Sequence, residues 1–328
     1  MYLSYHNLDR ALQHYGLSLS SVDLVIKGYR NTSHLIGLKD DSQANLIVYK
    51  SEPGIYERIR RTNQLADFIG DGDLPIRTTL DARISQFNIH NKTYHVSLYK
   101  YLPGETIPWE AYTKKHIKLL GWALGEFHEK AREFRGELPK VSDEYKQYVL
   151  KMSKYFTDKN VLSAMRDKLG ITPNIDYKIL AKTIDTLSTL PNQQALHMDF
   201  VRGNILFAES KPEYKLQLGD KAISGIIDLE KASFGHPVWD IGRSLAFLMV
   251  DCSQPVNKII KYFITSGYRK RGHQQTSLTS LKEVLDIFLV YDFYKFLRDN
   301  PYEDLSENHH YKKTRDILVA SNMLYLAK

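Results

Sequence analysis

The segment at residues 197–204 places three polar side chains where they can act together on a phosphate group. It reads His-Met-Asp-Phe-Val-Arg-Gly-Asn, so that four residues separate Asp199 from Asn204. Further along the chain, Asp228 follows a mostly apolar, strand-like run at residues 223–227. Phosphoryl transfer from ATP needs a carboxylate that accepts the proton of the attacking hydroxyl, and hard oxygen ligands that hold Mg²⁺. We therefore predict Asp199 as the catalytic base, and Asn204 and Asp228 as the magnesium ligands.

Asp240 is a further carboxylate, for which we predict a structural role. It lies at the start of a helix predicted over residues 238–250, after the sequence Gly-His-Pro-Val-Trp. A carboxylate in the first turn of a helix suits the N–H groups that have no partner within the helix. We therefore expect Asp240 to brace the catalytic loop rather than to take part in the chemistry.

The first hundred residues must position the nucleotide, and their pattern predicts a small antiparallel sheet with one long inserted helix. The helix, at residues 53–69, carries apolar side chains at three- and four-residue steps along one face. A short helix is predicted before the sheet, at residues 7–15. The predicted strands are residues 22–27, 32–38, 45–50, 77–87 and 93–101.

Beyond the Leu-Pro-Gly sequence at residues 102–104, the chain is predicted to be mostly helical. A small sheet followed by a larger helical part indicates the α+β class and two lobes. The predicted helices are residues 113–132, 145–169, 175–190, 238–250, 257–268, 278–297 and 311–326.

The order of these motifs resembles the protein-kinase-like small-molecule kinases, the group of aminoglycoside phosphotransferases, choline kinases and homoserine kinases. The resemblance includes Leu-Gly-Glu-Phe-His at residues 124–128 and extends from about residue 25 to residue 248. It implies a bilobal protein-kinase-like fold, with a nucleotide-binding N-lobe at residues 1–101. Residues 102–328 would form a C-lobe with the catalytic loop, the metal site and the acceptor pocket. It also implies that His197 shapes the catalytic loop through hydrogen bonds.

The resemblance further implies which residues contact the nucleotide. Lys50, at the end of a predicted strand, is similar to the lysine that contacts phosphate in the family. Asn31 and Ser33 lie in the loop that resembles the family's nucleotide-positioning loop. Tyr99 and Lys100 lie at the position of the hinge, where backbone groups would bind adenine.

Two glutamates are open to more than one interpretation. The family's phosphate-contacting lysine usually pairs with a glutamate on the following helix, and Glu57 is the only glutamate within residues 55–69. Glu57 lies closer to the helix start than the family's glutamate, which falls near Thr62. Glu230 follows Asp228 in a loop, so that it could reach the metal or an amine of the acceptor, or form a salt bridge at the surface.

Composition and charge exclude several classes of protein. The net charge is +7, but the basic residues are scattered and form no helix-turn-helix, zinc finger or basic arm, so nucleic-acid binding is not expected. A single cysteine, Cys252, excludes an internal disulfide. The N-terminus lacks a signal-peptide pattern, and the longest apolar runs are too short to cross a bilayer. We expect a cytoplasmic protein without a membrane partner, and the oligomeric state stays open.

The predicted function is an ATP- and Mg²⁺-dependent transfer of phosphate to a hydroxyl of a small molecule. An amino-alcohol, a homoserine-like or an aminoglycoside-like acceptor would each fit. Arg202 is suited to a carboxylate on the acceptor, to the ATP phosphates or to the protein itself. Alternatives on the same fold are a stress-type Ser/Thr protein kinase and a nucleotide-binding pseudokinase. Four carboxylates of the late helices are either an acidic pocket for an amine or solvent-exposed faces: Glu283, Asp286, Asp292 and Asp299.

Overall fold

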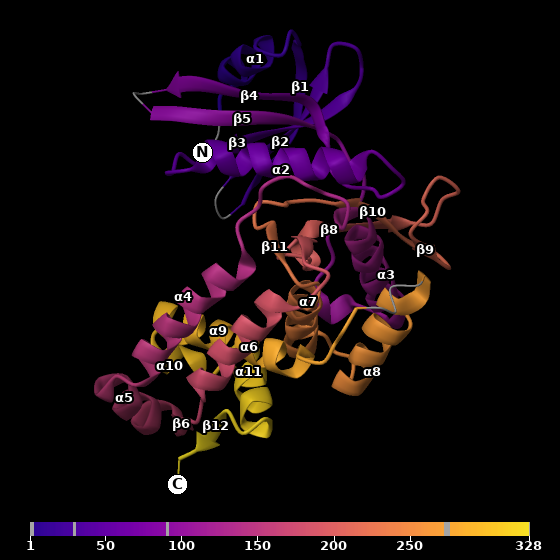
Figure 1. The fold of residues 1–328 in the computed structure, drawn as a ribbon. Coiled ribbons are helices and arrows are strands. Elements are labelled where there is room, and N and C mark those ends of the chain that lie inside the picture. The colour runs from indigo at the N-terminus through magenta and orange to yellow at the C-terminus, as the bar shows by residue number, and fades with distance from the viewer. Residues whose placement is uncertain (1–2, 29–30, 90–91, 272–275, 328) are drawn as a thin grey trace.

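In the computed structural model, the described residues are 3–28, 31–89, 92–271 and 276–327. The first part of the chain forms a five-stranded sheet with strand order β1-β2-β3-β5-β4, in which every neighbouring pair is antiparallel. Two helices pack on this sheet (Figure 1). The elements are α1 (Tyr5–Gln13), β1 (Leu19–Lys27), β2 (Thr32–Leu38), β3 (Gln43–Tyr49), α2 (Ile55–Gly70), β4 (Thr79–Ile89) and β5 (Lys92–Lys100).

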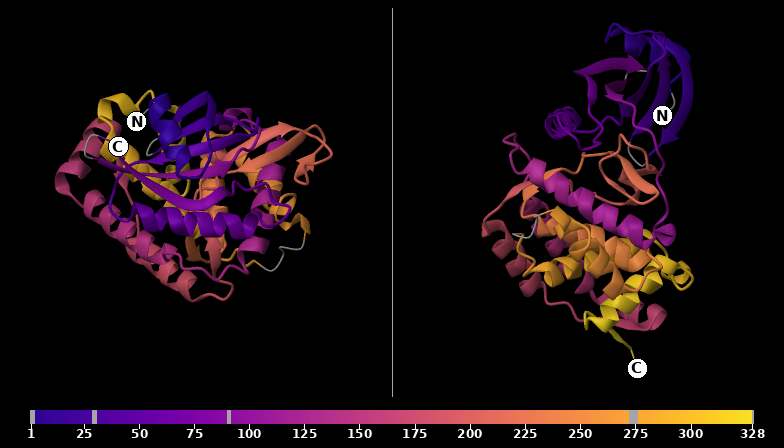
Figure 2. Two further views of the ribbon diagram at one scale, coloured as in Figure 1. Left: turned by 90° about the horizontal axis from the view of Figure 1, so that it is seen from above. Right: turned by 90° about the vertical axis from the view of Figure 1, so that its right-hand side faces the viewer.

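Both faces of β3 are covered, because successive side chains of a strand point to opposite faces. Leu46 and Val48 belong to a cluster shared with α1 and the neighbouring strands. Ile47 and Tyr49 belong to a second cluster, shared with Ile55 of α2 and its neighbours. Burial on both faces explains why the sequence of β3 is a continuous apolar run. Helix α2 lies along the side of the sheet that faces the rest of the molecule (Figures 1 and 2).

The remainder of the chain is mostly helical and lies on the other side of α2, which confirms the predicted α+β class (Figure 2). Its helices are α3 (Lys114–Ala131), α4 (Val141–Phe156), α5 (Lys159–Leu169), α6 (Tyr177–Thr189), α7 (Val238–Asp251), α8 (Val256–Ile260), α9 (Leu281–Asp299), α10 (Tyr302–Leu305) and α11 (His309–Ala320). Its short strands are β6 (Ile171–Pro173), β7 (Gln194–Leu196), β8 (Ile205–Glu209), β9 (Gln217–Leu218), β10 (Lys221–Ile226), β11 (Ser233–Gly235) and β12 (Leu324–Leu326).

Three predicted helices were wrong in extent. The helix predicted at residues 257–268 is α-helical only over Val256–Ile260 and continues as a π-helix over Lys261–Thr265. The helix predicted at residues 145–169 is two helices, because the Asp158 carboxylate accepts hydrogen bonds from the backbone N–H groups of Asn160 and Val161 and so starts α5 afresh. The helix predicted at residues 311–326 ends at Ala320, and the chain then forms β12, which pairs with β6. The boundaries at Asp158 and Ala320 fall at short polar segments, residues 157–160 and 321–322, and the prediction from periodicity continued each helix through them.

Paired short strands bring the catalytic segments together. β8 and β10 are antiparallel, and Ile205 lies opposite Ile226, so the residues flanking these two positions meet at one end of the pair. β7 and β11 are also antiparallel, with Leu196, just before the catalytic loop, opposite Ser233, so the segment that leads into α7 runs beside the segment that leads into the loop. Among the described residues, no helix has the length and apolar character needed to cross a membrane.

Candidate active site

A buried carboxylate holds the catalytic loop. Asp240, in the first turn of α7, is fully buried and accepts hydrogen bonds from the backbone N–H groups of His197 (2.8 Å) and Met198 (2.6 Å). Its Oδ2 also lies 3.0 Å from Nε2 of His128, on α3. These contacts confirm the prediction that Asp240 braces the loop. Met198 has a φ of 58°, a left-handed conformation that turns the chain toward Asp199.

Two buried histidines complete this framework. Nδ1 of His128 lies 2.8 Å from the Tyr268 hydroxyl, so His128 connects α3 to both Asp240 and Tyr268. Nδ1 of His197 accepts a 3.3 Å hydrogen bond from the backbone N–H of Asp199, as expected for a residue that shapes the loop. Burial lowers the pKa of His197, so its ring is neutral at neutral pH. His128 is part of the Leu-Gly-Glu-Phe-His motif, but its partners could not be inferred from the sequence.

Two cations face the carboxylate of Asp199. Nζ of Lys231 lies 2.9 Å from Oδ2, and Nη2 of Arg243 lies 3.4 Å from Oδ1. Burial raises the pKa of Asp199, but the charges of Lys231 and Arg243 outweigh burial and hold that pKa below its usual value. The carboxylate is therefore ionised at neutral pH, while 15% of its side chain remains exposed.

The predicted metal ligands lie on adjacent backbone segments. The backbone N–H of Ile227 donates to the carbonyl of Asn204 (2.9 Å), which places Asp228 beside Asn204. The Asn204 side-chain N–H₂ donates to the backbone carbonyl (2.9 Å) and to Oδ2 (3.2 Å) of Asp199, so its Oδ1 is the atom left for a cation. Asp228 has a φ of 63°, and its Oδ1 accepts from the N–H of Glu230 (3.3 Å).

These two side chains fit a magnesium ion that shares its ligands with a nucleotide. Amide and carboxylate oxygens are the hard donors that Mg²⁺ prefers, and the ion usually completes its octahedral shell with phosphate and water oxygens. Among the described residues, no three His, Cys, Asp or Glu side chains gather as a metal site that the protein could form alone. Two protein oxygens would therefore suit a metal that takes its remaining ligands from a bound nucleotide and water.

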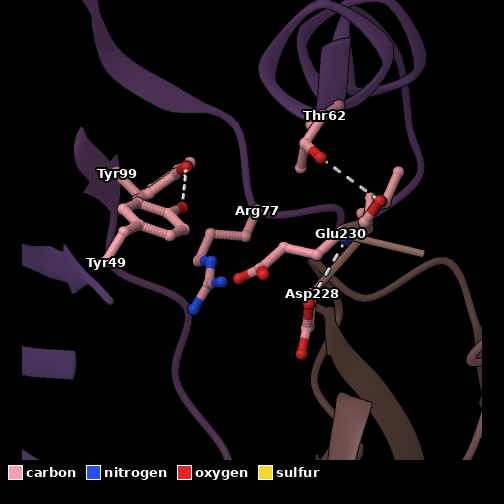
Figure 3. Close-up of a pocket in the computed structure, with 8 residues that line it drawn as sticks. Tyr49, Thr62, Arg77, Tyr99, Asp228 and Glu230 are labelled. Carbon is pink, nitrogen blue, oxygen red and sulfur yellow. Dashed lines mark hydrogen bonds between the residues drawn. The ribbon is translucent and has the colours of Figure 1, made fainter. Parts of the chain in front are cut away.

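A pocket lies between α2, the sheet and the segment after Asp228 (Figure 3). Its wall on the α2 side is anchored by the Thr62 hydroxyl, which donates to the carbonyl of Leu229 (3.3 Å). The side chain of Asn31, in the loop between β1 and β2, donates to the carboxylate of Glu230 and so connects the two lobes. The lining residues are Tyr49, Thr62, Ala66, Arg77, Tyr99, Asp228, Leu229 and Glu230.

The residues predicted to contact the nucleotide are not all on this pocket. Lys50 lies just beyond the end of β3 and is exposed, and its backbone N–H donates to Oδ1 of Asn31 (3.4 Å). Ser33 Oγ donates to Oδ1 of Asn45 (3.5 Å). Lys100 is exposed at the end of β5. Asn31 therefore joins the pocket through Glu230, whereas Lys50, Ser33 and Lys100 do not line it.

Tyr99 and Glu57 have different environments. The Tyr99 side chain is buried against α2, where its hydroxyl donates to Oδ1 of Asn63 (2.7 Å) and lies 2.5 Å from the Tyr49 hydroxyl. Glu57 is exposed and binds Nε of Arg60 at 2.8 Å. No ion pair joins Glu57 to Lys50 within the part of the chain that the structure describes.

Three basic residues near the site were not identified from the sequence. Lys231 follows Asp228 by three positions, and Arg243 follows Asp240 by three, so each shares a local segment with a predicted residue. That spacing could have suggested both. Arg77 lies two residues before β4, and its sequence context contains no comparable signal.

Most of the carboxylates considered for an acidic acceptor pocket have a basic partner in the structure. Three of the four carboxylates are engaged by a basic neighbour: Asp286 with Lys282 (2.9 Å), Asp292 with His310 (2.6 Å) and Asp299 with Arg298 (2.7 Å). Only Glu283 has a buried carboxylate oxygen without a hydrogen-bond partner among the described residues. The charges nearest Asp199 are instead the cations of Lys231 and Arg243.

Comparison with known proteins identifies the family and the fold. Residues 25–271 match the sequence profile described as the phosphotransferase enzyme family. The structure of a microcompartment-associated aminopropanol kinase is similar with a TM-score of 0.64 at 14% identity, covering 99% of this chain and 100% of that chain. A search of curated proteins found no match.

Two further solved structures share the fold. An amicoumacin kinase in complex with AMP-PNP, Ca²⁺ and Ami has a TM-score of 0.66 at 12% identity, over 96% of this chain and 94% of that chain. The GDP complex of aminoglycoside 2′-phosphotransferase-IIIa has a TM-score of 0.59 at 14% identity, over 96% and 100%. At this level of identity the likeness establishes the fold, and it confirms the predicted bilobal kinase-like architecture.

Proposed function

Because this chain belongs to the phosphotransferase enzyme family, we propose that it transfers the γ-phosphate of ATP to a hydroxyl group of a small molecule. We assign nucleotide binding to residues 1–101, and the catalytic loop, the metal site and acceptor binding to residues 102–328. The observation that carries the proposal is the meeting of Asp199, Asn204 and Asp228 beside the pocket between the lobes.

Asp199 is the proposed catalytic base. An alcohol is a poor nucleophile, so a carboxylate that orients it and accepts its proton lowers the barrier to attack. The cations of Lys231 and Arg243 keep Asp199 ionised. The hydrogen bond from the backbone N–H of Asp199 to Nδ1 of His197 fixes the backbone from which the carboxylate extends. An incoming hydroxyl would replace part of the contact with exposed Lys231, whose side chain is 52% exposed.

Asn204 and Asp228 are the residues proposed to hold a magnesium ion that would accompany the nucleotide. The bound Mg-ATP would supply the phosphoryl group, with the metal neutralising charge on its oxygens. The complex of the similar amicoumacin kinase with AMP-PNP and Ca²⁺ supports the use of an adenine nucleotide and a divalent cation. Asn31, Ser33, Lys50, Tyr99 and Lys100 stay candidates for contacts with the nucleotide.

The acceptor is proposed to bind on the side of Asp199 that faces α7 and α9. There the guanidinium of Arg243 lies 4.9 Å from the ring centre of Phe247 and 5.5 Å from that of Phe288. A cation between two aromatic rings offers both an ionic contact and apolar surface. Hydroxy acids and hydroxy amino acids therefore belong in the acceptor panel beside amino-alcohols and aminoglycosides.

The test is Mg²⁺-dependent release of ADP from ATP in the presence of each acceptor, with its deoxy analogue as the matched control. We expect one acceptor class to raise ADP release, and the deoxy analogue to give none. Mass spectrometry should find one added phosphate on the hydroxylated compound. Asp199→Asn should reduce kcat by about 10²- to 10⁴-fold, since proton acceptance contributes that much.

Each other outcome contradicts the proposal. Silence over the whole panel, with ATP binding intact, would favour a protein substrate or a pseudokinase. Turnover that survives Asp199→Asn would remove Asp199 from the role of base. An absence of ATP binding in the unmodified protein would refute the nucleotide site itself.

A further inference from the structure

The last side chain of β3 that faces α2 is a tyrosine. Tyr49 is the last residue of β3, and only 2% of its surface is exposed. Its hydroxyl lies 2.5 Å from that of Tyr99, which in turn donates to Asn63 on α2 (2.7 Å). Two phenols and an amide therefore fill the space between strand and helix with neutral groups. Lys50 is one residue further along and is exposed.

Helix α2 has no carboxylate directed at the pocket either. The α2 residue that contacts the segment after Asp228 is Thr62, through the carbonyl of Leu229. Glu57 binds Arg60 at the surface, and Asp67 accepts from the backbone and the side chain of Thr79 (both 2.7 Å). A lysine–glutamate pair between β3 and α2 is thus absent from the described part of the chain.

Arg77 is the cation that does line the pocket. Its backbone N–H donates to the carbonyl of Ile226 (2.9 Å), and the neighbouring Ile76 pairs with Ile226. The backbone of Arg77 is therefore held beside Ile226, which precedes Asp228 by two residues. Its guanidinium lies 5.0 Å from the ring centre of Tyr99. Figure 3 shows it extending between the two tyrosines and the Asp228–Glu230 segment.

The guanidinium has donors to spare. Within the described residues, no hydrogen bond or ion pair to the side chain of Arg77 is formed, although the side chain is half-buried. Arginine carries five N–H donors in a planar fork, which matches two oxygens of a phosphate group. The cation–π contact with Tyr99 restricts the guanidinium before any ligand binds, so less side-chain entropy is lost on binding.

We propose that Arg77 is the residue that binds the α- and β-phosphates of the nucleotide, in place of a lysine on β3. The Tyr49–Tyr99–Asn63 cluster then has a structural purpose, since it supports the guanidinium where a lysine–glutamate pair would otherwise stand. The inference rests on the proposed function only in taking a nucleoside triphosphate as the ligand. Under this inference, Arg77 contributes more to the binding of the phosphates than exposed Lys50 does.

The experiment compares the affinities of ATP and adenosine, measured by isothermal titration calorimetry, for five proteins. These are the unmodified chain, the variants Arg77→Met, Arg77→Lys and Lys50→Met, and one control variant. Methionine keeps the apolar stem against Tyr99 and removes the charge. Arg83→Met is the matched control, because Arg83 lies on β4, stacks 5.5 Å from the ring centre of Tyr15 and is remote from the pocket.

We expect Arg77→Met to weaken ATP binding about 10- to 100-fold, the loss of one charge-assisted contact, and to leave adenosine binding within about twofold. Arg77→Lys should restore part of the ATP affinity, and Lys50→Met should weaken it less than Arg77→Met does. Arg83→Met should leave both affinities unchanged.

Three results would overturn the inference. Equal loss of ATP and adenosine affinity in Arg77→Met would show a structural effect on the pocket. No loss of ATP affinity would exclude a phosphate contact, and a larger loss in Lys50→Met would return that role to Lys50. Failure of the unmodified protein to bind ATP would instead contradict the proposed function, so the two failures are distinguishable.

Discussion

The two walls of the cleft are built from opposite kinds of interaction. The catalytic loop is held by the buried carboxylate of Asp240, which accepts two backbone hydrogen bonds and faces His128. The facing wall of the pocket is held by neutral groups, the hydroxyls of Tyr49 and Tyr99. A buried charge is stable only with all its partners in place, whereas a buried hydroxyl tolerates partial satisfaction at lower cost.

This difference has a functional consequence. A base must keep its position to within a fraction of an ångström, and a fully satisfied buried charge gives the loop one arrangement only. The opposite wall is proposed to face a nucleotide, which supplies its own charges, and among the described residues that line the pocket Arg77 is the cation available to the phosphates. The loop of the proposed chemistry is thus held by a buried charge, and the wall proposed to bind the nucleotide is held by neutral hydrogen bonds.

The largest expected effect comes from removing the charge that holds the catalytic loop. Asp240→Ala leaves the N–H groups of His197 and Met198 and the ring of His128 without their partner in a buried site. We expect the free energy of unfolding to fall by about 3–5 kcal/mol, measured by urea unfolding followed by tryptophan fluorescence. Asp240→Asn keeps an acceptor oxygen and should lose less. A loss below about 1 kcal/mol for the alanine variant would contradict the comparison.

A second charged cluster joins α7, α9 and α11, and its contribution to the free energy of unfolding should depend on pH. His310 is hydrogen-bonded to Asp251 and Asp292 (2.6 Å each). Burial alone lowers the pKa of His310, but the two carboxylates outweigh it and raise that pKa to about 9. The folded state therefore binds the proton more tightly than the unfolded state, for which the pKa is about 6.5.

The sign of this pH effect follows directly from the raised pKa. The stabilisation by His310 is complete below about pH 6.5 and is lost as the pH rises through about 9. We expect His310→Gln to reduce the free energy of unfolding by roughly 2–3 kcal/mol at pH 6, and the difference from the unmodified protein to shrink at pH 10. A difference that stays constant from pH 6 to pH 10 would show that the histidine is not protonated in the folded state.

The neutral wall should be less sensitive. Tyr99→Phe removes the hydroxyl that connects Tyr49 to Asn63, and we expect the free energy of unfolding to fall by about 1 kcal/mol. Tyr112→Phe is the matched control, because the buried Tyr112 hydroxyl has no hydrogen-bond partner among the described residues, so its removal should be neutral or stabilising. Thermal unfolding of both variants, followed by circular dichroism, measures the difference. Equal losses would mean that the tyrosine cluster contributes only packing.

The smallest effect is expected at the exposed pair of Glu57 and Arg60. Glu57→Gln removes an ion pair in which both side chains are well exposed, so the free energy of unfolding should change by less than about 0.5 kcal/mol. Urea unfolding at low and high salt would check this. A loss above 1 kcal/mol would indicate that Glu57 has a second partner, such as Lys50, in solution.

The sequence by itself was sufficient for the fold class. It also singled out Asp199, Asn204 and Asp228, which the structure brings close together, while their catalytic and metal-binding roles stay predictions. Each lies in a short segment where a turn meets an apolar strand, a local pattern that limits where the side chain can point. Asp240 was also predictable, because a carboxylate in the first turn of a helix has few alternatives. Lys231 and Arg243 were within reach, since each lies three positions from a predicted residue.

The nucleotide wall was decided by tertiary structure, for two physical reasons. Successive side chains of a strand point to opposite faces, and β3 is buried on both, so its apolar pattern cannot tell whether Tyr49 or Lys50 faces α2. Arg77 reaches the pocket only because its backbone pairs with Ile226, which lies far away in sequence. Contacts of that range depend on how the lobes pack, and packing leaves no local trace in the order of residues.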